Sequence, residues 1–208
     1  MHKTPCAENR CPTAAEISSC HAPYLDAVIQ ETFRCAYVTP LTLRAATRDT
    51  QILGHFVPKG TIVWFSNTGP SFTRPEIEMG NTERTKGVLG DRKRVPPWDR
   101  KDMGTFLPER WLRPKAEAGN LTPVMEVRDY TYRDFEYNPS AGPMTAFGSG
   151  PRGCCGKRLI YLSMRILFTI ILLEFELQPC PENLTSDESI HGTASHPKQC
   201  FVRLEKAT

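Results

Sequence analysis

The chain has 208 residues, of which 39% are hydrophobic and 24% are charged. This length and balance are typical of one domain with a packed core, and they argue against a disordered protein. The formal net charge of +3 is too small to indicate a protein that binds nucleic acid.

Eight cysteines are scattered along the chain, and no secretory signal precedes them. We therefore expect free thiols in a reducing compartment. Cys6, Cys11, Cys20 and His21 lie close together in the sequence, but their spacing fits no common zinc finger. Residues 1–22 are interpreted as a poorly patterned leader.

An amphipathic helix is predicted from Pro23, because apolar residues recur with helical spacing at Leu25, Val28, Ile29 and Phe33. Glu31 and Arg34 are three residues apart in this helix, so they share one face and can form an ion pair. Taken alone, such a pair is usually exposed and contributes little to stability.

Short antiparallel strands are predicted within residues 39–65, where alternating and β-branched residues are frequent. Residues 58–60 read Pro-Lys-Gly and are predicted to form a turn. The polar residues 66–100 are predicted to be a long loop or an insertion. Within them, the basic triplet at residues 92–94 is interpreted as a solvated face.

Residues 106–112 read Phe-Leu-Pro-Glu-Arg-Trp-Leu. Taken alone, this stretch is interpreted as a turn that carries an aromatic patch. Residues 113–143 are rich in charge and proline, and they are predicted to be another loop.

A glycine-rich stretch, residues 147–156, reads Phe-Gly-Ser-Gly-Pro-Arg-Gly-Cys-Cys-Gly and runs into an apolar helical pattern. Gly150 and Gly153 permit unusual backbone torsions, and Arg152 adds a cation. Cys154 lies at the predicted start of the helix, where unpaired amides and the helix dipole favour thiolate over thiol. A thiolate is the form that binds metal. A capping loop with two buried thiols, or a redox pair, stays open as an alternative.

The helix that follows is predicted to run from Lys157 to about Phe175, with an apolar stripe formed by Leu159, Leu162, Ile166, Ile170 and Leu173. Its apolar run would span about 22 Å, short of the roughly 30 Å hydrocarbon core of a bilayer, and it contains Arg165. We therefore predict a core helix rather than a membrane span. Residues 198–204 alternate like a closing strand.

Three motifs together resemble the cytochrome P450 family of haem-thiolate monooxygenases. The loop at residues 147–156 is similar to the family's haem-binding loop, and Glu31-x-x-Arg34 is similar to its helix motif. Residues 106–111 match its Phe-x-Pro-Glu-Arg-aromatic motif. The resemblance covers residues 23–206 and only the C-terminal portion of the family's fold. It implies an α+β fold that is mainly α, with a small antiparallel β-sheet, in a partial domain over residues 23–208.

By this resemblance, Cys154 and not Cys155 is the axial ligand of the iron in haem b. Phe147 is expected to pack near the sulfur, while Arg152 and Arg44 are expected to contact the haem propionates. The full set of expected haem-binding residues is Phe147, Gly150, Arg152, Cys154, Gly156 and Arg44.

The family's helix motif implies a buried network around Glu31. Arg110 is expected to reach Glu31 beside Arg34 and so to complete a Glu-Arg-Arg network that fixes the segment before the cysteine loop. Losing one partner of a buried ion pair typically costs about 3–5 kcal/mol.

The resemblance also implies a reaction and partners. A complete member inserts one oxygen atom from O2 into a small apolar molecule and takes electrons from a donor such as an NADPH-dependent reductase. The donor docks on a basic face near Lys157, Arg158 and Arg165, for which a merely solvated helix face is the alternative. Complete members are often anchored in the endoplasmic reticulum and face the cytosol.

The central helix of the family, with an acidic residue beside threonine, is not found in this sequence, so no catalytic residue is predicted. A truncated monooxygenase is one interpretation. A remnant that binds haem weakly or needs a partner chain is another, and a haem-thiolate isomerase or dehydratase is a third. We expect such a portion to leave apolar surface exposed. Residues 77–95 resemble an insertion of some fungal members, which suggests fungal secondary metabolism.

Overall fold

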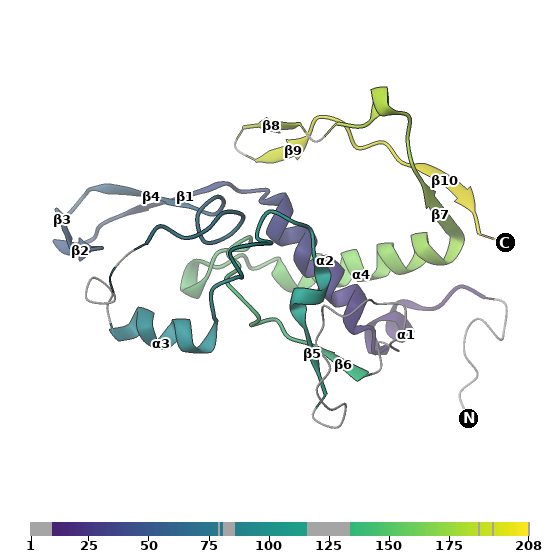
Figure 1. Ribbon diagram of the computed structural model, residues 1–208, viewed down its shortest axis with the longest axis horizontal. Helices are drawn as coiled ribbons and strands as arrows, with labels where there is room; N and C mark the ends of the chain where they lie inside the picture. Colours follow the sequence, from purple (N-terminus) through teal and green to yellow (C-terminus); the bar gives the residue numbers. More distant parts are fainter. Residues whose placement is uncertain are drawn as a thin grey trace.

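The computed structural model describes residues 10–78, 80, 86–115, 134–186, 188–192 and 194–207 (Figure 1). The helices are α1 (Ala14–Ser19), α2 (Pro23–Ala36), α3 (Lys86–Arg94) and α4 (Lys157–Glu174), and the 3₁₀ turns are η3 (Pro108–Trp111), η6 (Gly150–Arg152) and η7 (Glu182–Leu184). The strands are β1 (Leu41–Ala45), β2 (Thr50–Ile52), β3 (His55–Val57), β4 (Ile62–Ser66), β5 (Leu112–Pro114), β6 (Phe135–Tyr137), β7 (Phe175–Gln178), β8 (Ser189–His191), β9 (Ser195–Pro197) and β10 (Arg203–Lys206). Helices with small antiparallel sheets confirm the predicted fold class.

Helix α2 lies at the centre of the molecule and begins where the sequence predicts. Pro23 occupies its first turn, where the fixed proline torsion suits a helix and no amide hydrogen bond is lost. The helix ends before Tyr37, whose φ of 26° lies in the left-handed region. Its buried residues include Ala27, Ile29 and Glu31, so one carboxylate is buried in the interior.

The predicted strands are present as two antiparallel pairs. Strand β1 pairs with β4, and β2 pairs with β3 to form a hairpin. The predicted turn at residues 58–60 connects β3 to β4, and the amide of Thr61 donates to the carbonyl of Pro58 (3.2 Å). The β2–β3 turn was not predicted; there, Leu53 and Gly54 both have positive φ, as type I′ turns require.

The two segments predicted as loops between the motifs contain regular structure. Helix α3 lies in the segment predicted as an insertion, and strands β5 and β6 pair within the second predicted loop. Residues 79, 81–85 and 116–133 of these segments lie outside the described part of the chain. Strand β10 begins later than the predicted closing strand and pairs with β7.

Helix α1, within the segment interpreted as a poorly patterned leader, was not predicted. It is held by a capping box, in which the amide of Glu16 donates to Thr13 Oγ1 (3.3 Å) and the amide of Thr13 donates to Glu16 Oε2 (2.8 Å). Ile17 on this short helix is buried.

The buried apolar core lies between α2, η3 and the β5–β6 pair. It consists of Ala27, Trp98, Met103, Trp111, Leu112 and Phe135. The rings of Trp98 and Trp111 meet edge to face with centroids 4.7 Å apart. The indole of Trp98 also donates to the carbonyl of Pro143 (3.0 Å), which links the core to the segment before the cysteine loop.

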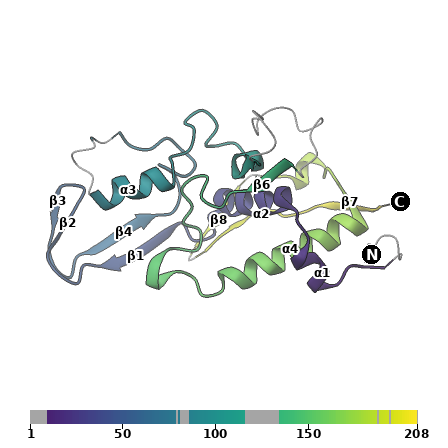
Figure 2. The same ribbon diagram turned by 90° about the horizontal axis from the view of Figure 1, so that it is seen from below.

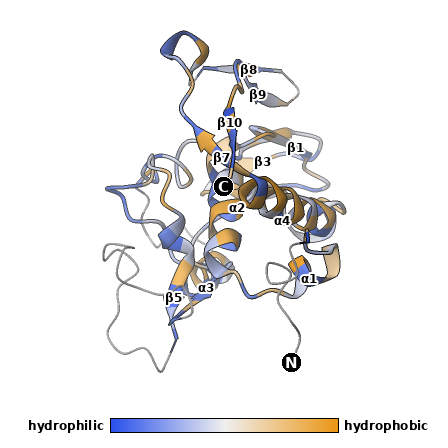
Figure 3. Ribbon diagram, turned by 90° about the vertical axis from the view of Figure 1, so that its right-hand side faces the viewer, coloured by the Kyte–Doolittle hydropathy of each residue, from blue (hydrophilic) through white to orange (hydrophobic). Residues whose placement is uncertain are grey.

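The prediction that α4 is a core helix is wrong in this structure. The structure describes all of α4, and none of its residues is buried. Leu159 is 65% exposed, and Figure 3 shows that much of the helix is hydrophobic. The reason is orientation, because Tyr161 and Arg165 face α2 and α1. Three residues of the apolar stripe, Leu159, Leu162 and Leu173, are therefore exposed, while Ile166 and Ile170 are half-buried. Among the described helices, none has the length and hydropathy of a membrane span.

Candidate functional site

The structure brings Glu31, Arg34 and Arg110 together in a buried cluster. Arg34 donates two parallel hydrogen bonds to the Glu31 carboxylate, from Nε to Oε2 and from Nη2 to Oε1, both 2.7 Å. Nε of Arg110 donates to Oε1 of Glu31 from 3.0 Å. The Glu31 and Arg34 side chains are 0% and 1% exposed, so this is not the exposed pair that the spacing alone would indicate.

Further donors to Glu31 were not predicted. The indole Nε1 of Trp111 donates to Oε2 (2.8 Å), and the amide of Leu107 donates to Oε1 (2.9 Å). Asp102 accepts from Nη1 of Arg110 (2.8 Å), so this second guanidinium bridges two carboxylates. Only the motif at residues 106–112 signalled that this stretch contacts α2, and no sequence spacing indicates Asp102.

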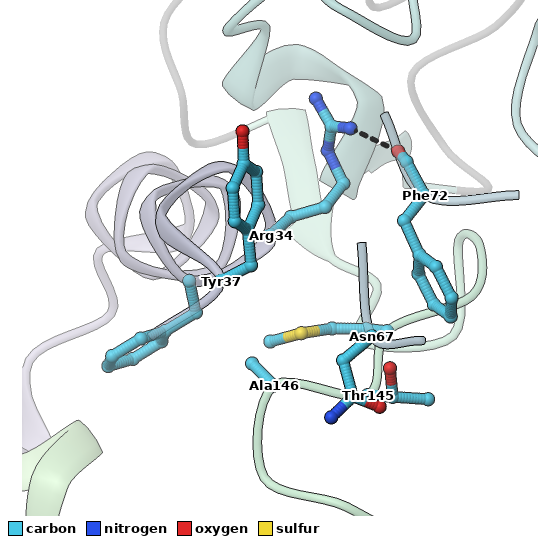
Figure 4. Close-up of a pocket in the computed structure, with 8 residues that line it drawn as sticks. Arg34, Tyr37, Asn67, Phe72, Thr145 and Ala146 are labelled. Carbon is cyan, nitrogen blue, oxygen red and sulfur yellow. Dashed lines mark hydrogen bonds between the residues drawn. The ribbon is translucent and has the colours of Figure 1, made fainter. Parts of the chain in front are cut away.

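These donors decide the charge of Glu31. Burial alone would raise the pKa of its carboxyl group. The hydrogen bonds from Arg34, Leu107 and Trp111 outweigh burial and hold the pKa of Glu31 below its ordinary value. Arg34 in turn donates to the carbonyl of Phe72 (2.6 Å), as Figure 4 shows. It also donates to the carbonyl of Met103 (2.8 Å), so it ties α2 to the segments after β4 and before η3.

The cysteine loop is shaped by two glycines in the left-handed region. Gly148 and Gly150 have φ of 64° and 63°. Gly153 differs from the prediction, since its φ of −60° is ordinary, and its need for glycine is steric. A Cβ there would lie 3.2 Å from the carbonyl oxygen of Gly150. The amide of Cys154 donates to the carbonyl of Phe147 (2.8 Å), which closes the loop.

Phe147 joins this loop to two helices. Its ring centroid lies 4.8 Å from that of Phe33 on α2 and 5.6 Å from that of Tyr161 on α4. The Phe33 and Tyr161 rings are 5.1 Å apart, so the three rings form one cluster beside the cysteine loop. Phe147 was predicted as part of the site, whereas its two ring partners were not.

An open cavity of about 440 Å³ lies beside Cys154. Its polar lining includes Arg44 from β1 and Arg152 from η6, and its apolar lining includes Phe33, Val38, Phe147 and Ile160. Four of the six predicted haem-binding residues therefore line one cavity. Gly150 shapes the loop, and Gly156 lies against the sulfur, since a Cβ there would be 3.7 Å from Cys154 Sγ.

The basic residues of α4 do not all belong to one exposed face, contrary to the sequence prediction. Arg165 is only 13% exposed in its side chain and pairs with Asp26. Lys157 and Arg158 at the start of the helix are exposed, and the Lys157 ammonium lies 5.8 Å from the centre of the Tyr161 ring.

A family model for cytochrome P450 matches residues 3–69 and 102–203. The chain belongs to the cytochrome P450 family. The match extends further toward the N-terminus than the predicted resemblance and leaves out the segment that contains α3.

Curated fungal cytochrome P450 proteins are similar over nearly the whole chain. The Hps1-dma1 cluster cytochrome P450 monooxygenase cyp3.1 of Dothistroma septosporum is 60% identical over 212 residues, which cover 100% of this chain and 65% of that relative. Cytochrome P450 monooxygenase TRI13 of Fusarium sporotrichioides is 41% identical over 201 residues, which cover 96% of this chain and 34% of that relative. The chain therefore spans between about a third and two thirds of the length of these relatives.

Solved cytochrome P450 structures share the fold. The cytochrome P450DA heme domain superposes with a TM-score of 0.60 at 16% identity, covering 96% of this chain and 34% of the other. Cytochrome P450 CYP102L1 gives a TM-score of 0.57 at 23% identity, covering 93% of this chain and 33% of the other.

Cytochrome P450 membership implies a haem, and the residues at the cavity fit one. A haem needs an axial iron ligand, two cations for its propionates and an apolar surface for its ring. The cavity offers the Cys154 thiol, two guanidinium groups and several apolar side chains. Among its described lining residues none carries a carboxylate, so no negative side chain there opposes the propionates.

Proposed function

We propose that this chain binds haem b through the Cys154 thiolate and forms the cysteine side of a monooxygenase site. The observation that carries the proposal is one cavity that Cys154, Arg44 and Arg152 share with apolar side chains. Guanidinium groups match carboxylates in geometry and charge, which suits them to propionates. Cys155 is exposed but does not line this cavity, which supports Cys154 as the ligand.

The chain's residues would act mainly by holding the Cys154 thiolate and the guanidinium groups of Arg44 and Arg152 in place. Haem supplies the oxygen chemistry, to which a thiolate ligand adds electron density that favours O–O cleavage. The Phe147 ring packs on Phe33 of α2, and the Phe147 carbonyl accepts a hydrogen bond from the amide of Cys154. The network around Glu31 fixes α2 against η3, and α2 presents Phe33 to the cavity.

The proposed reaction is the insertion of one oxygen atom from O2 into a small apolar substrate. Relatives named monooxygenases support the reaction type, and their fungal origin agrees with a role in fungal secondary metabolism. Electrons would come from an NADPH-dependent reductase on the side of the exposed cations Lys157 and Arg158, where complementary charge assists docking. Such a reductase is found at the cytosolic face of the endoplasmic reticulum, which is the location we propose.

A second candidate is a chain that binds haem but catalyses nothing unless another polypeptide covers it. The exposed stripe of α4 favours this candidate, since Leu159, Leu162 and Leu173 are 65%, 42% and 46% exposed. Apolar patches of this kind mark surfaces that bind a partner.

Two measurements test these proposals on the purified chain. Titration with haem should saturate at one haem per chain, and Arg44→Met with Arg152→Met should weaken binding by about tenfold or more, as expected for two lost charge-assisted contacts. Arg113→Met, which alters an exposed arginine paired with Glu136, should leave binding unchanged. A saturable haem site that ignores the Arg44 and Arg152 changes would contradict the assigned cavity.

Labelled dioxygen distinguishes the reactions. With a reductase, NADPH and apolar substrates, a monooxygenase incorporates one labelled atom into product. Haem binding without product favours the second candidate. Conversion of a hydroperoxide or an oxime without the reductase would indicate the isomerase or dehydratase alternative instead.

A further inference from the structure

Helices α2 and α4 run side by side in opposite directions (Figure 2). Two pairs of polar side chains join them. Tyr161 on α4 donates its hydroxyl hydrogen bond to Gln30 on α2, and Arg165 on α4 pairs with Asp26 on α2. The partners are four residues apart on each helix, so both pairs form in the same antiparallel register.

The Tyr161 pair lies next to the cysteine loop. Gln30 is only 4% exposed, so its side chain has little access to water as an alternative partner. The Tyr161 ring also packs on Phe33 and Phe147, and burial raises the pKa of its hydroxyl to about 12. The hydroxyl therefore stays protonated and able to donate at neutral pH.

The Arg165 pair joins three helices. Besides Asp26, its guanidinium donates from Nε to the carbonyl of Ile17 (3.1 Å) and from Nη2 to the carbonyl of Cys20. These carbonyls belong to the last turn of α1 and its C-cap, where a cation is favoured. One side chain therefore holds α1, α2 and α4 together.

Sliding α4 along α2 by one helical turn would move it by about 5.4 Å and break both pairs at once. Cys154 lies three residues before the start of α4, and its loop packs on Tyr161 through Phe147, so the register of α4 sets where the sulfur lies. We propose that Tyr161 and Arg165 are positioning residues that fix α4 on α2 and thereby hold the Cys154 sulfur at the cavity. This inference rests on the proposed haem site.

The test uses the full chain with Tyr161→Phe, Arg165→Met, Asp26→Asn and the double variant Arg165→Met/Asp26→Asn. Arg203→Met is the matched control, since Arg203 forms an exposed pair with Glu205. The first readout is hydrogen exchange without haem. We expect faster exchange at the Cys154 amide and along α4 in the Arg165→Met chain, with little change at the Leu107 amide, which is bonded to Glu31. Equal acceleration at all these amides would show a general loss of stability and overturn the proposal.

The second readout is haem binding. Arg165→Met should weaken haem binding by about tenfold. Asp26→Asn should weaken it less, because Arg165 keeps its bonds to the carbonyls of Ile17 and Cys20. The double variant should be no worse than Arg165→Met alone, because both substitutions remove the same pair. Arg165→Lys should recover part of the loss. Tyr161→Phe keeps the ring and should lose less. If the unmodified chain binds no haem, the proposed function fails. If it binds haem and all variants match it, only the positioning role fails.

Discussion

Glu31 and Cys154 belong to the same set of family motifs, yet they lie in opposite environments. The Glu31 carboxylate is fully buried and accepts hydrogen bonds from Arg34, Arg110 and Trp111. Cys154 is exposed, beside an open cavity and ahead of a helix with no buried residue. The Glu31 carboxylate therefore has several buried donors within this chain, whereas the cysteine side exposes its thiol and much of its apolar helix to solvent.

The difference follows from where the partners of each residue lie. All donors to Glu31 come from α2 and from the segment between Leu107 and Trp111, which folds back onto α2. Among the described residues, the cysteine loop packs on other elements through Phe147, whose ring meets Phe33 and Tyr161. Its backbone hydrogen bonds lie within the loop or reach its flanking residues, Thr145 and the start of α4. If this comparison is right, substitutions near Glu31 should be costly, and those on the outer face of α4 should cost little.

The largest effect is expected for Glu31→Ala. It leaves two buried guanidinium groups without their carboxylate and should lower the free energy of unfolding by about 3–5 kcal/mol in urea titrations. Glu136→Ala removes the carboxylate of the exposed Arg113 pair and should cost no more than about 1 kcal/mol. Similar losses for the two variants would contradict the buried role of the Glu31 carboxylate.

Gly142→Ala tests how tightly the core beside the network is packed. A Cβ at this position would lie 2.5 Å from ring atoms of Trp98, which is itself packed on Trp111. We expect a loss of about 1–3 kcal/mol in thermal or urea unfolding. Gly90→Ala, in helix α3 with no atom within 4 Å of the added Cβ, should instead gain up to about 1 kcal/mol. A neutral Gly142→Ala would mean that Trp98 can move aside.

Trp111→Phe removes a single donor to Glu31 while most of the ring remains. We expect a loss of about 1–3 kcal/mol in the free energy of unfolding, because a buried carboxylate loses a hydrogen bond. Trp64→Phe, at a side chain that is 66% exposed, should stay within about 0.5 kcal/mol. Equal effects at the two tryptophans would argue against the indole bond.

The lowered pKa of Glu31 predicts how stability depends on pH. Its contribution is fully present above the ordinary glutamate pKa of about 4.3 and is lost as pH falls through the lower value of the folded state. Glu31→Gln should therefore flatten the acid side of the curve of unfolding free energy against pH. An unchanged slope below pH ~4 would contradict the proposed ionisation.

The smallest effect is expected on the outer face of α4. Leu159→Gln, at a side chain that is 65% exposed, should change the free energy of unfolding by no more than about 0.5 kcal/mol. Ile29→Ala, on the buried face of α2 at 1% exposure, should cost about 2–5 kcal/mol. A large loss for Leu159→Gln would indicate that this face is covered in solution.

Helical periodicity explains why α2 and α4 were predictable. Each has apolar residues at helical spacing over several turns, and α2 also has Pro23 at its start. Helix α3 has no buried residue and contains Gly90, so no apolar stripe was available to predict it. Strands β5 and β6 were missed because they are far apart in sequence and pair through tertiary contacts.

The residues of the site were predictable only where interacting residues are close in sequence or belong to a known family motif. The spacing of Glu31 and Arg34 placed them on one face, but only the resemblance connected Arg110 to them. Sequence periodicity showed which residues of α4 share a face, but not which face is covered. That orientation depends on Tyr161 and Arg165 meeting α2, a tertiary arrangement that no short pattern reports.

The most direct test of the account is the absorbance of the reduced, haem-loaded chain with carbon monoxide. A thiolate-ligated band is expected for the unmodified chain and for Cys155→Ala, and it should be absent for Cys154→Ala. A thiolate band that survives Cys154→Ala but disappears with Cys155→Ala would contradict the assignment of the ligand on which the proposed site depends.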